Sequence, residues 1–138
     1  MRSFPFNRDW QRRNAILQPY LRTGGSVAPF DPTVDIVHFQ NLPVEVVTRL
    51  LQERYLDPDE RQNDSPSASE FFAFMQRHPR VLAHGYAISI EREDYRVTIE
   101  GVSYRGPTSE SLRRDAERLF AGADEYRMDA DGLYVWFD

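Results

Sequence analysis

The sequence predicts an α+β domain in which an antiparallel sheet of four to five strands carries helices packed mainly on one face. Two observations lead to this prediction. Segments with apolar residues at helical spacing alternate with short β-branched segments, and two pairs of strand-like segments are joined by turn signals, as in β-hairpins. The order strand, helix, helix, hairpin, helix, hairpin contains the split β-α-β-β-α-β pattern. A ferredoxin-like connectivity with additions is therefore our first expectation, and a four-stranded meander is the alternative.

Four segments have helical signals. The first, residues 7–21, opens with Asn7 as its expected N-cap, and Pro19 should kink or end it. The S-x-x-E capping box that starts at Ser67 is the sharpest helix start in the chain. The other helices are expected at residues 44–55, 67–78 and 107–122.

The first predicted strand spans residues 34–40, after a Gly- and Pro-rich loop at 23–33. A hairpin follows at residues 81–105. A turn at Glu93-Asp94 would pair Ile88 with Ile99 and His84 with Ser103. That register places four apolar residues on one face, which are Ile88, Ile90, Val97 and Ile99, and it puts His84 on the same face.

The last fifteen residues form a second predicted hairpin. Asp131-Gly132 is a type I′ turn signal. This turn pairs Met128 with Val135 and Tyr126 with Phe137 on an apolar face, and it pairs Arg127 with Trp136 on a polar face.

The composition indicates one domain over residues 1–138. All 17 basic residues are arginine, so chemistry that needs a lysine amine is excluded. Cysteine is absent, which excludes disulfides and thiolate metal sites. Residues 57–66 hold two prolines and four carboxylates with no apolar side chain, and we expect them to form a mobile acidic loop.

The net charge of −5 argues against nucleic acid as the main partner. No segment has the length of apolar sequence that crosses a bilayer, and the first residues lack the apolar run of a secretory signal. We therefore expect a cytoplasmic protein without membrane contact. No cofactor is expected, because nucleotide-binding and metal-ligand motifs do not occur in the sequence. Unpaired edge strands would allow a homodimer through sheet extension without requiring one.

Two sets of residues are candidates for binding a partner. Tyr134 and Trp136 line up with Arg127 on the polar face of the last hairpin, where a cation–π pair is expected. These residue types are enriched at binding hot spots. The alternative for this face is burial beneath a helix such as residues 7–21. The second set lies in the acidic loop, which would steer toward a basic partner, and comprises Asp57, Asp59, Glu60 and Asp64.

A third set would suit a small enzyme or a small-molecule site. Its members are polar side chains on neighbouring predicted strands, namely His84, His38, Tyr86 and Glu100. No catalytic motif accompanies them. The preferred function is therefore a non-catalytic, acidic protein-binding module of the inhibitor, immunity or adaptor type, whose partner has a basic surface. The alternative is an enzyme or ligand-binding domain with a cleft near His84 and His38.

Overall fold

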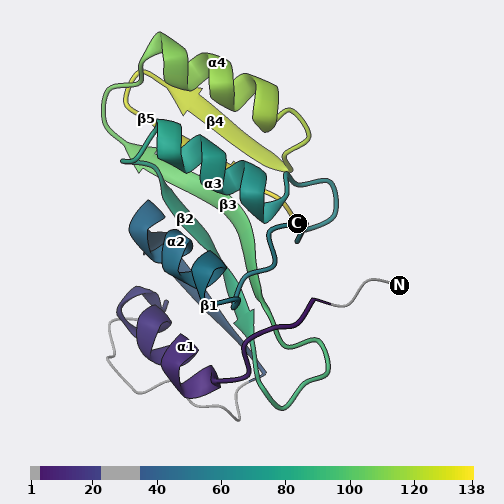
Figure 1. The fold of residues 1–138 in the computed structure, drawn as a ribbon. Helices are drawn as coiled ribbons and strands as arrows, with labels where there is room; N and C mark the ends of the chain where they lie inside the picture. Colours follow the sequence, from purple (N-terminus) through teal and green to yellow (C-terminus); the bar gives the residue numbers. More distant parts are fainter. Residues whose placement is uncertain (1–3, 23–34) are drawn as a thin grey trace.

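The structure is a computed structural model that describes residues 4–22 and 35–138. The predicted loop 23–33 and the first residue of the predicted first strand lie outside the described residues. The helices are α1 (Trp10–Leu17), α2 (Val44–Gln52), α3 (Ala68–Arg77) and α4 (Glu110–Leu119). The strands are β1 (Ile36–Leu42), β2 (Leu82–Ile88), β3 (Val97–Arg105), β4 (Glu125–Asp129) and β5 (Gly132–Trp136). The helices lie on one side of the sheet, as Figure 1 shows, so the predicted α+β class and one-sided helix layer are confirmed.

The strand order is β1-β2-β3-β5-β4, and every neighbouring pair is antiparallel. The last strand, β5, lies between β3 and β4, which therefore run parallel to each other and are connected through α4. This part is a split β-α-β unit. In contrast, β1 pairs directly with β2 although α2 and α3 connect them. The ferredoxin-like connectivity is thus adopted only in the second half of the chain, and the meander alternative is wrong because β3 pairs with β5 instead of β4.

Local capping explains where the helices begin. The Ser67 hydroxyl accepts the N–H of Glu70 at 3.2 Å, and the Glu70 carboxylate accepts the N–H of Ser67 at 3.0 Å, so the predicted capping box is confirmed. The cap of α1 is Asp9, whose carboxylate accepts the N–H of Arg12, and the prediction of Asn7 was wrong by two residues. A 3₁₀ turn follows α1 and contains Pro19, where the kink was expected.

The core lies between the helices and the covered face of the sheet. Its centre is a cluster of four buried phenylalanine rings from α3, from the end of α4 and from the residue after β5, with centroid distances of 4.9 to 6.3 Å. These are Phe71, Phe74, Phe120 and Phe137. Aromatic pairs in such offset and edge-to-face arrangements stabilise a core beyond the area that they bury.

The register of the first hairpin differs from the prediction. Ala87 pairs with Val97, and residues 89–96 form a longer connection than the predicted two-residue turn. Ile88 and Ile99 are both buried, yet Ile88 pairs with Ile36 on the face opposite the core cluster that contains Ile99. The predicted common face for these two residues was therefore wrong.

The second hairpin keeps its predicted faces but shifts its register by two residues. Met128 pairs with Leu133, and Arg127 pairs with Tyr134 instead of Trp136, because the turn residues are 130 and 131. A register shift by an even number of residues changes which residues are paired but leaves each side chain on the same face of the sheet. Tyr126 remains on the core side, but β4 is an edge strand and this side chain is 36 % exposed.

Candidate functional site

The sheet face opposite the helices brings two of the predicted residue sets together. Residues that are directly paired in neighbouring strands point to the same face of a sheet. His38 pairs with Tyr86, and Tyr134 pairs with Arg127, so the members of each pair lie together on the face opposite the helices. We call this surface the open face and define it by the candidate residues that it carries, which are His38, His84, Tyr86, Glu100, Arg127, Tyr134 and Trp136. The candidates for protein binding and those for a small-molecule cleft are therefore neighbours on one surface.

His84 and Tyr134 stack on each other across β3. Their ring centroids are 5.4 Å apart and their planes differ by 8°. The imidazole lies over Gly101, because a Cβ added to this glycine would be 2.6 Å from Nε2 of His84 and 1.9 Å from the carbonyl oxygen of Val135. His84 thus pairs with Gly101 on the open face, whereas the sequence predicted Ser103 as its partner and the apolar face as its position.

His84 is held in its neutral form. Its Nε2 is buried and has no hydrogen-bond partner among the described residues. Burial lowers the pKa of His84 to about 4, the positive charge of Arg22 contributes to the decrease, and the Val135 carbonyl opposes it. A neutral imidazole with this pKa is a poor proton acceptor at neutral pH.

Glu100 lies at a β-bulge in the centre of the open face. His84 pairs with Gly101 and the next residue, Gly85, pairs with Ile99, which leaves Glu100 without a partner residue on β2. Nδ1 of His38 is 4.0 Å from the Glu100 carboxylate. Burial raises the pKa of Glu100, while His38 and a hydrogen bond from the Trp136 side chain oppose this increase. The bulge therefore directs one half-buried carboxylate toward a histidine and a tryptophan.

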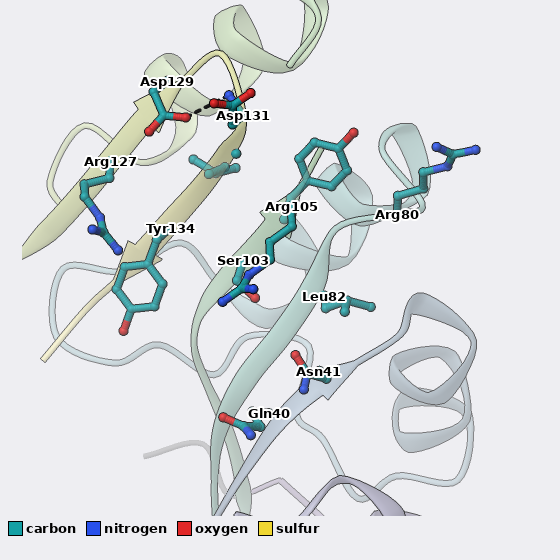
Figure 2. Close-up of a pocket in the computed structure, with 13 residues that line it drawn as sticks. Gln40, Asn41, Arg80, Leu82, Ser103, Arg105, Arg127, Asp129, Asp131 and Tyr134 are labelled. Atoms are coloured by element: carbon teal, nitrogen blue, oxygen red, sulfur yellow. Dashed lines mark hydrogen bonds between the residues drawn. The ribbon is translucent and has the colours of Figure 1, made fainter. Parts of the chain in front are cut away.

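A groove of about 890 Å³ crosses one end of the open face. It is shown in Figure 2. Five strands and two adjoining loops contribute its lining, which includes Gln40, Asn41, Arg80, Leu82, Ser103, Arg105, Arg127 and Tyr134. Two aspartates, Asp129 and Asp131, stand at the β4–β5 turn, where the carboxylate of Asp129 accepts the N–H of Asp131 at 2.8 Å.

The predicted cation–π pair forms within this groove, although with a single aromatic partner. The guanidinium carbon of Arg127 is 5.7 Å from the centre of the Tyr134 ring. Trp136 pairs with Glu125 on the β4 side, so the two-residue change in register separates it from Arg127. Burial also raises the pKa of Tyr134, and this phenol therefore stays protonated at neutral pH.

The acidic segment makes specific contacts with the sheet, one of them with Tyr86 of the open face. The carboxylate of Glu60 is 3.0 Å from Nε of Arg96 and accepts the hydroxyl of Thr98 at 2.9 Å. The amide oxygen of Gln62 accepts the hydroxyl of Tyr86 at 2.8 Å. Asp57, Asp59 and Asp64 do not share these contacts, and the last two are exposed. The segment is thus attached to the sheet at Glu60 and Gln62, and its mobility stays a prediction.

Several lining residues of the groove were missed by sequence reasoning. The sequence predicts Arg105 only as the end of the hairpin at residues 81–105, and Ser103 only as the partner of His84. Gln40 and Asn41 come to the groove at a bulge in β1, where Asn41 has φ of 60°. Asparagine tolerates this conformation better than most residues, but a single asparagine ahead of a proline reads equally well as a helix cap.

Within residues 4–22 and 35–138, no group of three or more His, Asp or Glu side chains is arranged to hold a metal ion. None of the helices described there is long and apolar enough to cross a membrane. Comparison of the chain with models of protein families, with curated proteins and with solved structures gives no match.

Proposed function

We propose that the chain is a non-catalytic protein-binding module that contacts its partner through the open face. The observation that supports this proposal most directly is the one-sided helix layer, which leaves Trp136, Tyr134 and Arg127 on the opposite side of the sheet. Tryptophan, tyrosine and arginine dominate binding hot spots because they combine apolar contact area with a polar group. All three side chains are partly or fully accessible.

The protonation states on the open face favour binding over catalysis. A general base should have a pKa near the working pH, whereas His84 has a pKa of about 4 and its Nε2 faces Gly101. The nearest acid–base pair, His38 and Glu100, is separated by 4.0 Å. These groups suit recognition of a partner better than proton transfer.

The acidic segment provides a second contact in this proposal. Asp57, Asp59 and Asp64 give a negative surface that complements a basic region of the partner. Glu60 pairs with Arg96 and is not counted in this surface. We expect this segment to affect the rate of association more than the lifetime of the complex.

A small-molecule site is the second candidate function, and one observation favours it. A hollow of about 220 Å³ lies beside the half-buried Glu100, and its lining also includes His38 and Tyr86. A buried carboxyl with a raised pKa next to a histidine is a recognised mark of a functional cleft. His84 does not line this hollow, so the predicted cleft set is divided by the structure.

The test uses the full chain as bait in a lysate of its own cells, followed by titration of each captured protein. Trp136→Ala should weaken binding at least about tenfold, as expected for a hot-spot residue, while the matched control Trp10→Ala on α1 should bind like the wild type. The triple variant Asp57→Asn/Asp59→Asn/Asp64→Asn should reduce the association rate. The control variant Glu45→Gln/Glu110→Gln/Glu117→Gln changes the net charge by the same amount and should keep the association rate of the wild type.

Unchanged affinity and salt dependence in both test variants would contradict the proposal. The second candidate is followed separately, by recording the NMR signal of the Trp136 indole N–H while a library of small polar compounds is added. A saturable shift that disappears in Glu100→Gln would favour the small-molecule function over the protein-binding one.

A further inference from the structure

We infer that the groove binds an extended, acidic segment of the partner protein through Arg105 and Arg127, on either side of Tyr134. This inference rests on the proposed function and adds to it the chemistry of the ligand. It is carried by the shape of the groove, by the state of its arginines and by the distribution of its carboxylates.

Small residues create the groove. The floor between β2 and β4 is formed where Ser103 of β3 pairs with Tyr134, and where Arg105 pairs with Gly132. A Cβ on Gly132 would lie 2.6 Å from the carbonyl oxygen of Tyr104, so this position of β5 admits no side chain. The groove crosses the strands from Gln40 on β1 to Arg127 on β4 and is therefore long enough for a segment of several residues.

Among the described residues Arg105 and Arg127 form no ion pair with a carboxylate, and the guanidinium of Arg127 lies over the ring of Tyr134. Some arginines elsewhere pair closely with carboxylates, as Arg96 does with Glu60 at 3.0 Å and Arg77 with Asp115 at 3.1 Å. Unpaired guanidinium groups beside an aromatic ring are suited to binding carboxylates, because each offers a planar pair of N–H donors.

Figure 2 shows how these side chains are directed. Arg127 extends from β4 toward Tyr134, and Arg105 extends along the groove over Ser103. Arg80 points away from Tyr134 and is not part of the inferred site. The two remaining guanidinium groups can thus hold successive acidic side chains of a segment that passes over the Tyr134 ring.

The carboxylates of this face favour a polypeptide over a nucleic acid. Asp129 and Asp131 stand at one end of the groove, and Glu100 lies near the centre of the sheet. A phosphate backbone carries a charge at every nucleotide, so it would meet these carboxylates and the net charge of −5 along its whole length. An extended peptide has acidic side chains only at selected positions, and alternate residues point to one side.

The experiment measures fluorescence anisotropy of a labelled eight-residue peptide of alternating Glu and Val, titrated with the full chain. A Gln–Val peptide is the neutral probe, and an eight-nucleotide U-rich RNA is the competing ligand class. Arg105→Gln/Arg127→Gln is the test variant. Arg114→Gln/Arg118→Gln on α4 is the control with the same change in net charge.

We expect the Glu–Val peptide to bind with strong salt dependence, and the test variant to bind it at least about tenfold more weakly, as loss of charge-assisted hydrogen bonds predicts. The control variant should bind like the wild type. Charge reversal in Arg105→Glu/Arg127→Glu should transfer binding to a Lys–Val peptide, which also shows that the altered groove is folded.

Three results would overturn the inference. They are equal binding of the Gln–Val peptide, equal loss in the test and control variants, and tighter binding of the RNA than of the acidic peptide. A natural partner that loses affinity on Trp136→Ala but is indifferent to Arg105→Gln/Arg127→Gln would also overturn it, while leaving the proposed function in place.

Discussion

The imidazole of His84 lies parallel to the phenol ring of Tyr134, and the two rings connect β2 to β5 above the strand between them. This contact depends on the absence of a side chain at Gly101. The stack therefore makes the stability of the open face sensitive to the protonation of one residue and to the size of another.

The first prediction concerns pH. Because the pKa of His84 is lowered to about 4 in the folded protein, the unfolded chain binds a proton first as the pH falls below about 6.5. The stabilisation that comes from keeping this imidazole neutral is complete above pH 6.5 and is lost between pH 6.5 and 4, by up to about 3 kcal/mol.

Urea denaturation at several pH values should show this decrease in the unfolding free energy in the wild type and a smaller decrease in His84→Phe, which keeps a flat ring. A wild-type stability that is constant over this range would contradict the prediction.

The second prediction concerns Gly101. In Gly101→Ala the added methyl group would meet the Val135 carbonyl and His84, so the sheet must open locally, at a cost of about 3 kcal/mol. Gly122→Ala is the matched control, since its nearest contact is 3.9 Å away, and its unfolding free energy should change by less than about 1 kcal/mol. Chemical denaturation measures both values. Equal stability of the two variants would show that the close approach over Gly101 is absent in solution.

The third prediction concerns Glu100, whose charged form has a higher free energy in the folded protein than in the unfolded chain. Since burial raises its pKa, the folded protein retains the proton to a higher pH and stability decreases as the pH rises above the ordinary range of this carboxyl. Glu100→Gln should therefore raise the melting temperature at pH 7 by about 2–4 °C, and the difference should disappear near pH 4. Glu125→Gln at the exposed end of β4 is the control. A lower melting temperature for Glu100→Gln at pH 7 would mean that its contacts with Trp136 and His38 outweigh the cost of burial.

The fourth prediction concerns the start of α3. Ser67→Ala removes the hydroxyl that accepts the N–H of Glu70 and should cost about 1 kcal/mol of stability. Ser111→Ala, at an exposed position inside α4, should change stability by less than about 0.5 kcal/mol. Thermal denaturation compares the two variants. If they are equally stable, the capping box does not contribute to the start of this helix.

Features that depend on neighbouring residues in the chain were predictable. The capping box at Ser67 and the turn at Pro19 follow from the conformations that these residues allow. The faces of the last hairpin were also predictable, because strand side chains alternate and an error of two residues preserves that alternation.

Features that depend on distant contacts were not predictable. The register of β2 and β3 is set in part by Tyr95, which the sequence placed in the strand. Its hydroxyl donates to the backbone oxygen of Asn7 at 2.9 Å, and the guanidinium of Arg13 lies 4.4 Å from its ring centre. These contacts hold Tyr95 in the connection between the strands. The bulges at Glu100 and Asn41 likewise follow from the packing of whole strands, so the groove could not be predicted from the sequence.

The position of β5 affects how the protein is made. As a ribosome synthesises the chain, β4 emerges before β5 and has no place in the sheet until the later strand fills the gap beside β3. Because β4 pairs with β5 alone, it can join the sheet only as part of the hairpin that β5 completes, and the edge of β3 beside β5 stays unpaired until that hairpin forms.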